Sequence, residues 1–192
     1  MEPKTAKPSR KLRADSIRNR ELLLEAATQI FSTGGPQASL EAVARQAGLG
    51  IGTLYRHFPT REALFEAVYR HEVDHLGDLA EKLACGGDPI EALRTWLHAN
   101  VRLVATKKGM IEGLQLVAHG SSELKAYSFE RLTGAIALLL ERAVAADKIR
   151  SDVSPEDLLR ALVGIFYSQG AVEWHATVLR LVDIFVDGLR KY

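Results

Sequence analysis

An all-α fold is predicted for this chain of 192 residues by three observations. Apolar residues recur at helical spacing along nearly the whole sequence, and no convincing run alternates apolar and polar residues with the period of a β-strand. Glycine and proline fall between the periodic segments, as at 34–36 and 86–87, where they are expected to end helices. The pattern divides into about nine helices.

The N-terminal third of the chain predicts an arm followed by three helices. Pro3 and Pro8 disfavour a regular helix at the start, so the arm is expected to be flexible. Ser39 is expected to cap the first of two short helices, and Gly48 to turn the chain into the second. The predicted ranges are 1–14 for the arm and 15–33, 40–47 and 51–57 for the helices.

The remaining two thirds of the chain predict six further helices. Asp88-Pro89 and Ser154-Pro155 indicate N-termini, because a side-chain oxygen caps the first amides and proline suits the first helical position. Lys107-Lys108-Gly109 favours a C-terminus. We place a domain boundary near residue 66, which separates an N-terminal unit over 15–66 from a C-terminal unit over 67–192. The predicted helices cover 60–84, 89–107, 110–118, 121–146, 154–169 and 173–191.

The composition excludes several classes of protein. With 47% hydrophobic and 26% charged residues, the chain has ordinary globular values and is not expected to be disordered. Its single cysteine, Cys85, excludes a disulfide framework and a thiolate metal centre. No apolar run approaches the roughly 20 residues that a membrane span needs, and no apolar segment follows the basic N-terminus as in a secretory signal. We therefore expect a soluble, cytoplasmic protein without a cofactor.

Positive charge is concentrated at the N-terminus. Residues 1–20 carry seven basic and two acidic side chains, although the formal net charge of the whole chain is only +1. A basic end on a nearly neutral body suits an anionic partner such as nucleic acid. The alternative is that the basic segment only aids solubility.

The segment from Ser39 to Leu64 carries the most specific signal. Two short helices joined by a tight glycine-containing turn are the helix-turn-helix pattern, which places its second helix in the major groove of DNA. The sequence reads SLEAVARQAGL at 39–49, GTLYRHF at 52–58 and TREAL at 60–64. Over 15–66 the chain resembles the DNA-binding domain of TetR-family transcriptional repressors. The resemblance implies a three-helix DNA-binding domain followed by a helical domain for ligand binding and dimerisation.

The side chains of this segment are consistent with that pattern. Ala44 and Gly48 are small, as expected where two helices approach closely. Ser39 can offer its hydroxyl group and the nearby backbone amides to a phosphate. A miniature core is expected where apolar side chains from the two short helices and the residues that follow them meet the first helix, namely Ile30, Phe31, Leu40, Val43, Leu49, Leu54, Phe58 and Leu64.

The resemblance also assigns roles to individual residues. Arg56 is the only long hydrogen-bond donor among the base-reading positions, and arginine pairs most often with guanine. Gly50 stands where the family often has serine, so the usual hydroxyl cap is missing, and Arg61 replaces a more frequent lysine. Glu41 could accept from cytosine, but a solvated helix face is the simpler interpretation. The implied backbone contacts are Ser39, Thr53, Tyr55 and Arg61, and the implied base contacts are Ile51, Gly52, Tyr55 and Arg56.

A second motif points to a different chemistry. His71-Glu72-Val73-Asp74-His75 matches the HExxH signature of zinc hydrolases, which needs two histidines on one helical face, a general-base glutamate and a third ligand. No third ligand has a recognisable spacing, and His71 and His75 share an apolar stripe with Leu64, Val68 and Leu79. We therefore expect both histidines to line an inter-helix contact, and the chain not to be an enzyme.

The C-terminal unit has no specific motif, so its candidates rest on residue type. Effector pockets are mostly apolar with a few polar groups, which favours Trp96, Asn100, Met110, Leu114, Gln115, His119, Tyr127, Phe166 and Tyr167. The simpler alternative is that most of these build the core. The last two helices are apolar on more than one face, which indicates a subunit interface. Its candidates are Leu158, Leu162, Phe166, Val178, Val182 and Phe185.

The sequence thus predicts a homodimeric, sequence-specific regulator of transcription. Its partners would be a double-stranded DNA operator and a small, largely apolar effector that releases a repressor from that operator. Two alternatives remain: a metal-dependent hydrolase that uses His71, Glu72 and His75, and a DNA-binding protein without an effector.

Overall fold

The computed structural model describes residues 10–34, 38–111, 122–167 and 174–191. Over these ranges the chain forms eight α-helices and no β-strand, which confirms the all-α fold. None of these helices is long and apolar enough to cross a membrane. They are α1 (Arg10–Gly34), α2 (Leu40–Gln46), α3 (Ile51–His57), α4 (Arg61–Ala84), α5 (Pro89–Ile111), α6 (Ser122–Ala145), α7 (Pro155–Tyr167) and α8 (Trp174–Gly188).

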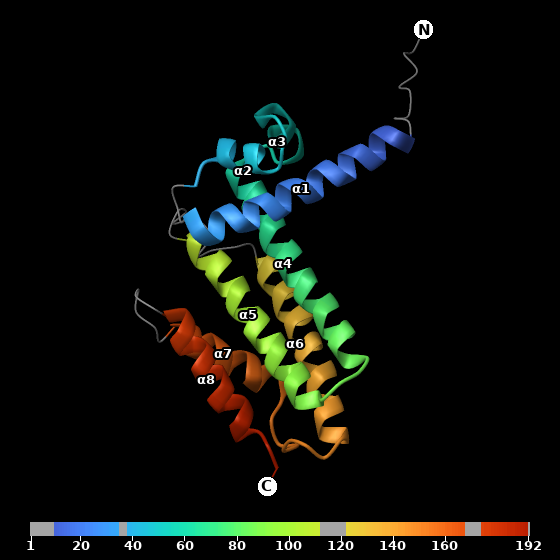
Figure 1. Ribbon diagram of the computed structural model, residues 1–192, viewed down its shortest axis with the longest axis vertical. Coiled ribbons are helices and arrows are strands. Elements are labelled where there is room, and N and C mark those ends of the chain that lie inside the picture. Colours follow the sequence, from blue (N-terminus) through green and yellow to red (C-terminus); the bar gives the residue numbers. More distant parts are fainter. Residues whose placement is uncertain (1–9, 35–37, 112–121, 168–173, 192) are drawn as a thin grey trace.

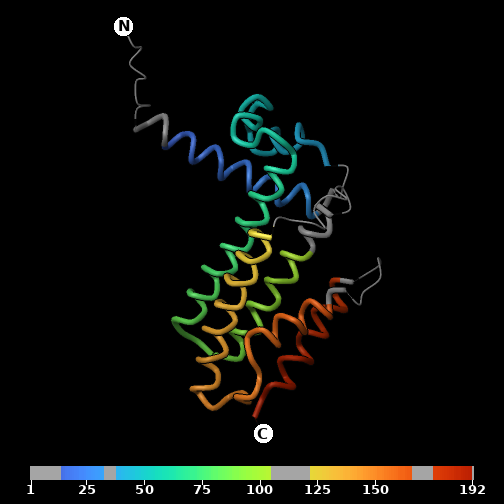
Figure 2. The backbone as a smooth tube through the Cα atoms, turned by 180° about the vertical axis from the view of Figure 1, so that it is seen from behind, coloured from blue at the N-terminus to red at the C-terminus, as the bar shows by residue number. Residues whose placement is uncertain are grey.

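The helices form two groups that share α4. Helix α1 crosses one end of α4, with α2 and α3 beside it, and its N-terminal turns extend beyond them (Figure 1). Helices α4, α5 and α6 run side by side as a bundle, seen from behind in Figure 2. Helix α7 packs on α6, and α8 packs on α5 and α7. The short helices α2 and α3 therefore lie at one end of an elongated molecule.

The start of α1 and the end of α5 differ most from the sequence prediction. Helix α1 begins at Arg10, inside the predicted arm, because the residues after Pro8 are mostly good helix formers. Helix α5 continues through Gly109 to Ile111, since one glycine in a helix costs only about 1 kcal/mol. The predicted break at 107–109 is therefore wrong. The helix predicted over 110–118 starts inside α5, and the rest of it lies outside the described residues.

The predicted N-terminal caps are present. The Asp88 carboxylate accepts hydrogen bonds from the amides of Ile90 and Glu91, at 2.9 and 3.0 Å. Ser154 and Asp157 cap each other reciprocally, because the Asp157 amide donates to the serine hydroxyl and the Ser154 amide donates to the carboxylate. These local bonds fix where α5 and α7 begin.

The buried apolar side chains gather in two clusters. The first joins α1, α2, α3 and the start of α4, and contains the predicted miniature core, with Ile30 and Leu49 at its margin. The second joins α4 to α5, α6, α7 and α8. Helix α4 supplies Leu64, Phe65 and Val68 to the first cluster and residues from Val73 onward to the second. Only one helical turn of α4 separates the two cores.

Helices α4 and α6 also meet through charged groups on their outer edge. The Arg131 guanidinium lies 3.1 Å from Asp78 and 3.4 Å from Glu81, both on α4. It reaches them across Gly77, where a Cβ atom would stand 2.4 Å from the guanidinium carbon. The Tyr127 hydroxyl donates to Asp74, and this bond is the main reason that the pKa of Tyr127 is raised.

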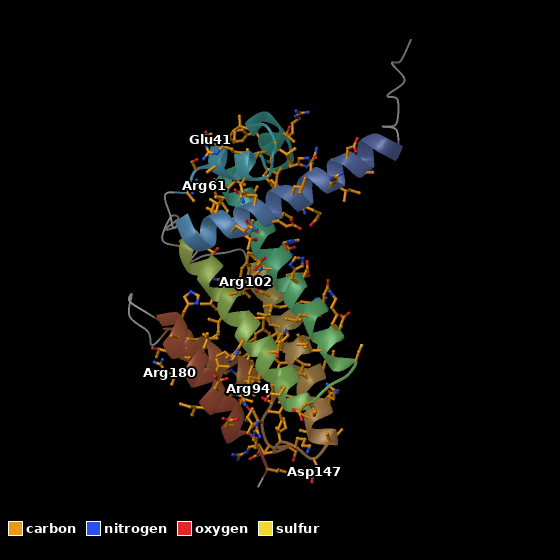
Figure 3. The ribbon with its side chains drawn as sticks, in the orientation of Figure 1. Glu41, Arg61, Arg94, Arg102, Asp147 and Arg180 are labelled. Carbon is orange, nitrogen blue, oxygen red and sulfur yellow. The ribbon has the colours of Figure 1, made fainter. Side chains whose placement is uncertain are left out.

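A second charged cluster holds α8 against α5. Arg94 on α5 is largely buried and donates to Asp183 at 2.8 Å and to Asp187 at 2.6 Å, both on α8 (Arg94 is labelled in Figure 3). The hydrogen bond from Arg94 is the main reason that the pKa of Asp183 is lowered. His98 lies 2.9 Å from the same Asp183 oxygen. One arginine therefore fixes two consecutive turns of α8.

Replacing Arg94 tests this cluster. We expect Arg94→Ala to lower the free energy of unfolding by about 1–2 kcal/mol, less than for a fully buried pair because both carboxylates are half exposed. Arg160→Ala is the matched control, since Arg160 is 71% exposed and its salt bridge to Asp157, one turn before it, joins two residues of the same helix. Urea unfolding followed by circular dichroism measures both, and equal stability of the two variants would contradict the role of Arg94.

Candidate nucleic-acid interface

Helices α2 and α3 are joined by a tight turn over residues 47–50. Gly48 has φ of +69°, a left-handed conformation that side chains other than glycine rarely adopt. The Leu49 amide then donates to the Ala44 carbonyl at 2.8 Å, which closes the end of α2. A Cβ atom at Gly48 would meet no atom within 4 Å. The expectation that Gly48 allows close helix approach is therefore wrong, and the glycine serves the backbone conformation.

Helix α3 has one buried side and one exposed side. Leu54 is completely buried in the first core, and Phe58 follows it there. On the other side, Tyr55 is 46% exposed although it is a large aromatic residue. As predicted, Gly50 caps α3 without a side-chain hydrogen bond. The candidate base-contacting positions comprise Gly52, Tyr55 and Arg56, which are exposed, and Ile51, which is half-buried, as is Thr53.

Arg56 is folded back along its own helix. Its Nε donates to the Gly52 carbonyl at 3.2 Å, and Nη2 lies 3.4 Å from the Thr53 hydroxyl. Both contacts are exposed to solvent, so they are easily exchanged for contacts with another acceptor. The structure thus brings Gly52, Thr53 and Arg56 together on one edge of α3.

A groove of about 350 Å³ separates this edge of α3 from α1. The N-terminal part of α1 supplies its polar wall, and the groove opens to solvent beside the exposed face of α3. Sequence reasoning missed the α1 residues, although Ser16 and Asn19 precede Leu23 by seven and four residues and so continue the stripe of α1 that carries Leu23 into the core. The groove is lined by Asp15, Ser16, Asn19, Thr53, Arg56 and His57.

The two remaining candidate backbone contacts lie at helix N-termini. Ser39 is exposed and caps α2, accepting from the Ala42 amide at 3.0 Å. Arg61, the first residue of α4, is half-buried and donates to the Ala38 carbonyl at 2.7 Å. Glu41 is exposed on α2, in keeping with a solvated face. Ser39 thus faces solvent, whereas the Arg61 guanidinium is engaged within the protein.

The HExxH segment lies on α4 where this helix packs against α1. His71 is mostly buried, and its Nδ1 lies 3.6 Å from Glu21 on α1. The pKa of His71 is lowered, first by burial and then by the charge of His75. The nearby carboxylates raise it, but by less. Glu72 is buried and accepts from the Thr28 hydroxyl, so it also joins α4 to α1. His75 is exposed, which corrects the prediction that both histidines line a helix contact.

His71 and Glu72 of the HExxH segment make their contacts with α1. Among the described residues, no group of three or more histidine, cysteine, aspartate or glutamate side chains is placed to hold a metal ion. Glu72, which would be the general base, is instead hydrogen-bonded to Thr28 at 3.1 Å. The segment therefore contributes to helix packing.

The effector candidates are only partly brought together. Trp96 is completely buried and donates to the Leu76 carbonyl at 2.7 Å, so it belongs to the second core. Tyr127 lies at the α4–α6 edge, bonded to Asp74. Asn100 is 3% exposed, and its Nδ2 has no hydrogen-bond partner among the described residues. The side chains of Met110, Leu114, Gln115, His119, Phe166 and Tyr167 lie outside the described residues.

The interface candidates are mostly in the core of their own chain. Leu158, Leu162, Val178 and Val182 have no exposed surface, so they are unavailable to a partner, and Phe185 is half-buried. The Phe166 side chain lies outside the described residues. Two large hydrophobic residues next to these candidates in the sequence are exposed instead. Val163 on α7 is 43% exposed and Ile184 on α8 is 67% exposed.

Comparison with known proteins gives the class of the chain. A model of the family described as "Bacterial regulatory proteins, tetR family" matches residues 23–68. A second, described as "Transcriptional regulator SbtR-like, C-terminal domain", matches residues 88–191, which is more than half of the chain. The protein therefore belongs to the TetR family of DNA-binding transcriptional regulators. This class is not enzymatic, so the family assignment removes the hydrolase alternative.

Individual relatives agree with this assignment. The TetR transcriptional regulator SCO0520 from Streptomyces coelicolor is 41% identical, with a TM-score of 0.79 over 89% of this chain and 98% of that one. A TetR regulator from Mycobacterium vanbaalenii is 33% identical, with a TM-score of 0.73 over 94% and 99%. The curated regulator UidR of Escherichia coli is 37% identical over 75 residues, which span 38% of this chain and 35% of UidR. The curated matches thus span about a third of those relatives.

The exposed face of α3 can be tested by substitution. We expect Tyr55→Ala to weaken binding to all DNA sequences similarly. Arg56→Ala should in addition relax the preference at one base pair by about 1–3 kcal/mol. The exposed Arg160→Ala variant, on α7, controls for the loss of one positive charge. Fluorescence anisotropy with duplexes selected by the wild-type protein and their point variants measures each effect, and unchanged binding by both α3 variants would contradict the assignment.

Proposed function

We propose that the protein is a homodimeric repressor that a small, largely apolar effector releases from its operator. Each subunit inserts α3 into a major groove, and the two recognition helices read two half-sites. The observation that carries this proposal is the continuity of α4, which belongs to both hydrophobic cores. A change in the C-terminal core therefore alters the position of the DNA-binding unit.

Exposed and half-buried polar groups of the N-terminal unit would make the DNA contacts. Ser39, Thr53 and Tyr55 supply hydroxyl groups for phosphates, and Arg56 exchanges its contacts within α3 for a base edge. The basic residues at the start of α1 add attraction for the backbone, because the first turns of α1 extend beyond α3 (Figure 1). Ser16 and Asn19 border the same groove and extend this surface.

A second copy of the chain would cover the apolar face of α7 and α8. Val163 and Ile184 are large hydrophobic side chains with 43% and 67% exposure, on adjacent helices at the end of the molecule away from α3. A two-fold axis through this face buries the same patch of both subunits. It also leaves both DNA-binding units at one end of the dimer.

The effector would bind within the C-terminal bundle, near Asn100. A buried amide donor without a partner is costly, and a ligand acceptor such as a carbonyl group would satisfy it. The surrounding core is apolar, which favours a largely apolar molecule over a phosphorylated one. The regulator LfrR from Mycobacterium smegmatis has the same fold and is 21% identical to this chain. It has been crystallised in complex with proflavine.

Charged substitutions test the dimer. We expect Val163→Asp and Ile184→Asp to give folded monomers, because each places an unpaired carboxylate in the interface while leaving the core of the chain intact. Leu138→Asp is the matched control, since Leu138 is a 38% exposed hydrophobic residue on α6, a helix that is not part of the proposed interface. Analytical ultracentrifugation measures the mass. Parental dimers in both test variants would place the interface elsewhere.

Thermal-shift screening tests the effector. Hydrophobic compounds with one acceptor group should stabilise the protein, by about 2.7 kcal/mol at a concentration 100 times the Kd, and should weaken DNA binding by the reciprocal coupling. Asn100→Leu should lose the shift. Ser128→Ala should keep it, because the buried Ser128 hydroxyl already donates to the Leu124 carbonyl. Compounds that stabilise the protein but leave DNA affinity unchanged would favour a regulator without an effector.

A further inference from the structure

The Arg61 side chain lies where α1, α2 and α4 meet; Arg61 is labelled in Figure 3. Its guanidinium carbon is 5.0 Å from the Phe65 ring centroid and 5.9 Å from the Phe31 ring centroid. These two rings are almost completely buried and meet edge to face, with centroids 4.5 Å apart. The cation therefore rests on an aromatic pair that belongs to the first core.

The same guanidinium is bonded to the segment that enters α2. Nη2 donates to the carbonyl oxygen of Ala38 at 2.7 Å, and Ala38 is 8% exposed. This carbonyl belongs to the peptide bond that joins Ala38 to Ser39. Because the peptide is planar, a bond to its oxygen also orients the Ser39 amide and the start of α2. Ser39 in turn caps α2 through its hydroxyl group.

Arg61 therefore connects three elements through one side chain. Phe31 comes from α1, Ala38 from the entry to α2, and Phe65 from α4, one turn beyond Arg61 itself. A planar guanidinium can stack on aromatic rings while it donates at its edge, whereas a lysine ammonium is a compact, strongly hydrated charge. The observed contacts need both the stacking face and the donating edge of a guanidinium, whereas a contact with a phosphate needs only a positively charged donor.

We propose that Arg61 is a positioning residue, which holds Ser39 and α2 in place for DNA instead of neutralising a phosphate. This inference rests on the proposed role of Ser39 in contacting the DNA backbone. It replaces the phosphate contact that the resemblance implies for Arg61. The charge of Arg61 then serves the contacts between α1, α2 and α4. Its loss lowers the affinity for DNA only by displacing Ser39 and α2.

The salt dependence of DNA binding distinguishes the two roles. A residue that neutralises one phosphate contributes about one unit to the slope of log K against log salt concentration. For a positioning residue, Arg61→Met should weaken binding about tenfold and lower the thermal midpoint, with the slope unchanged. Arg61→Lys, which keeps the charge, should also bind more weakly than the wild type. The probe is the duplex that the wild-type protein selects from a randomised pool.

A double-mutant cycle measures the coupling between Arg61 and Ser39 in DNA affinity. A residue that only stabilises the fold would show no such coupling. The loss in affinity caused by Arg61→Met should be smaller when Ser39 is already alanine, because part of it acts through Ser39. The control cycle with Tyr55→Ala, on α3, should be additive. Measurements are made well below the thermal midpoint of each variant, and Arg61→Lys carries the test if Arg61→Met does not fold.

Two results would overturn the inference. One is a slope that falls by about one unit in Arg61→Met and returns, together with full affinity, in Arg61→Lys. The other is that the losses in DNA affinity caused by Arg61→Met and Ser39→Ala are strictly additive. This result counts when the wild-type protein selects a duplex and Ser39→Ala alone weakens binding to it. Failure of the wild-type protein to select any duplex, or of Ser39→Ala to weaken binding, would instead contradict the proposed function and its contact set.

Discussion

Helix α4 places Leu64 and Val68 in one hydrophobic core and Val73 and Leu76 in the other, with only one turn between them. Neither core can shift along α4 without disturbing packed side chains, because protein interiors are close-packed. The polar contacts from Thr28 to Glu72 and from Glu21 to His71 fix α1 to this same stretch of α4. The DNA-binding unit is thus attached to the bundle by both a continuous helix and buried packing.

The features that depend on neighbouring residues could be predicted from the sequence. Asp88 and Ser154 cap helices because their side-chain oxygens reach amides two or three residues away. The helix-turn-helix was predictable for a similar reason, since its turn needs a left-handed residue and has Gly48. The family resemblance then gave the class of protein. Interactions between residues close in sequence were therefore sufficient to predict which segments form helices and where the candidate DNA-binding face lies.

The features that depend on tertiary contacts could not be predicted in this way. Two apolar stripes on α7 and α8 indicate two buried surfaces, but the sequence does not say which stripe faces the chain's own core. Leu162 and Val182 turned out to face that core, and Ile184 is exposed. Arg61 is another case, because the Ala38 carbonyl that accepts its hydrogen bond is 23 residues away.

The contact of Arg131 across Gly77 bears on which substitutions α4 tolerates. Any side chain at 77 would meet the end of a flexible arginine, which can move aside at little steric cost. Once displaced, Arg131 no longer neutralises Asp78 and Glu81, which stand one turn apart on α4. The penalty for even a methyl group is therefore electrostatic rather than steric. It amounts to a few tenths of a kcal/mol to about 1 kcal/mol for each exposed pair, and added salt would mask it.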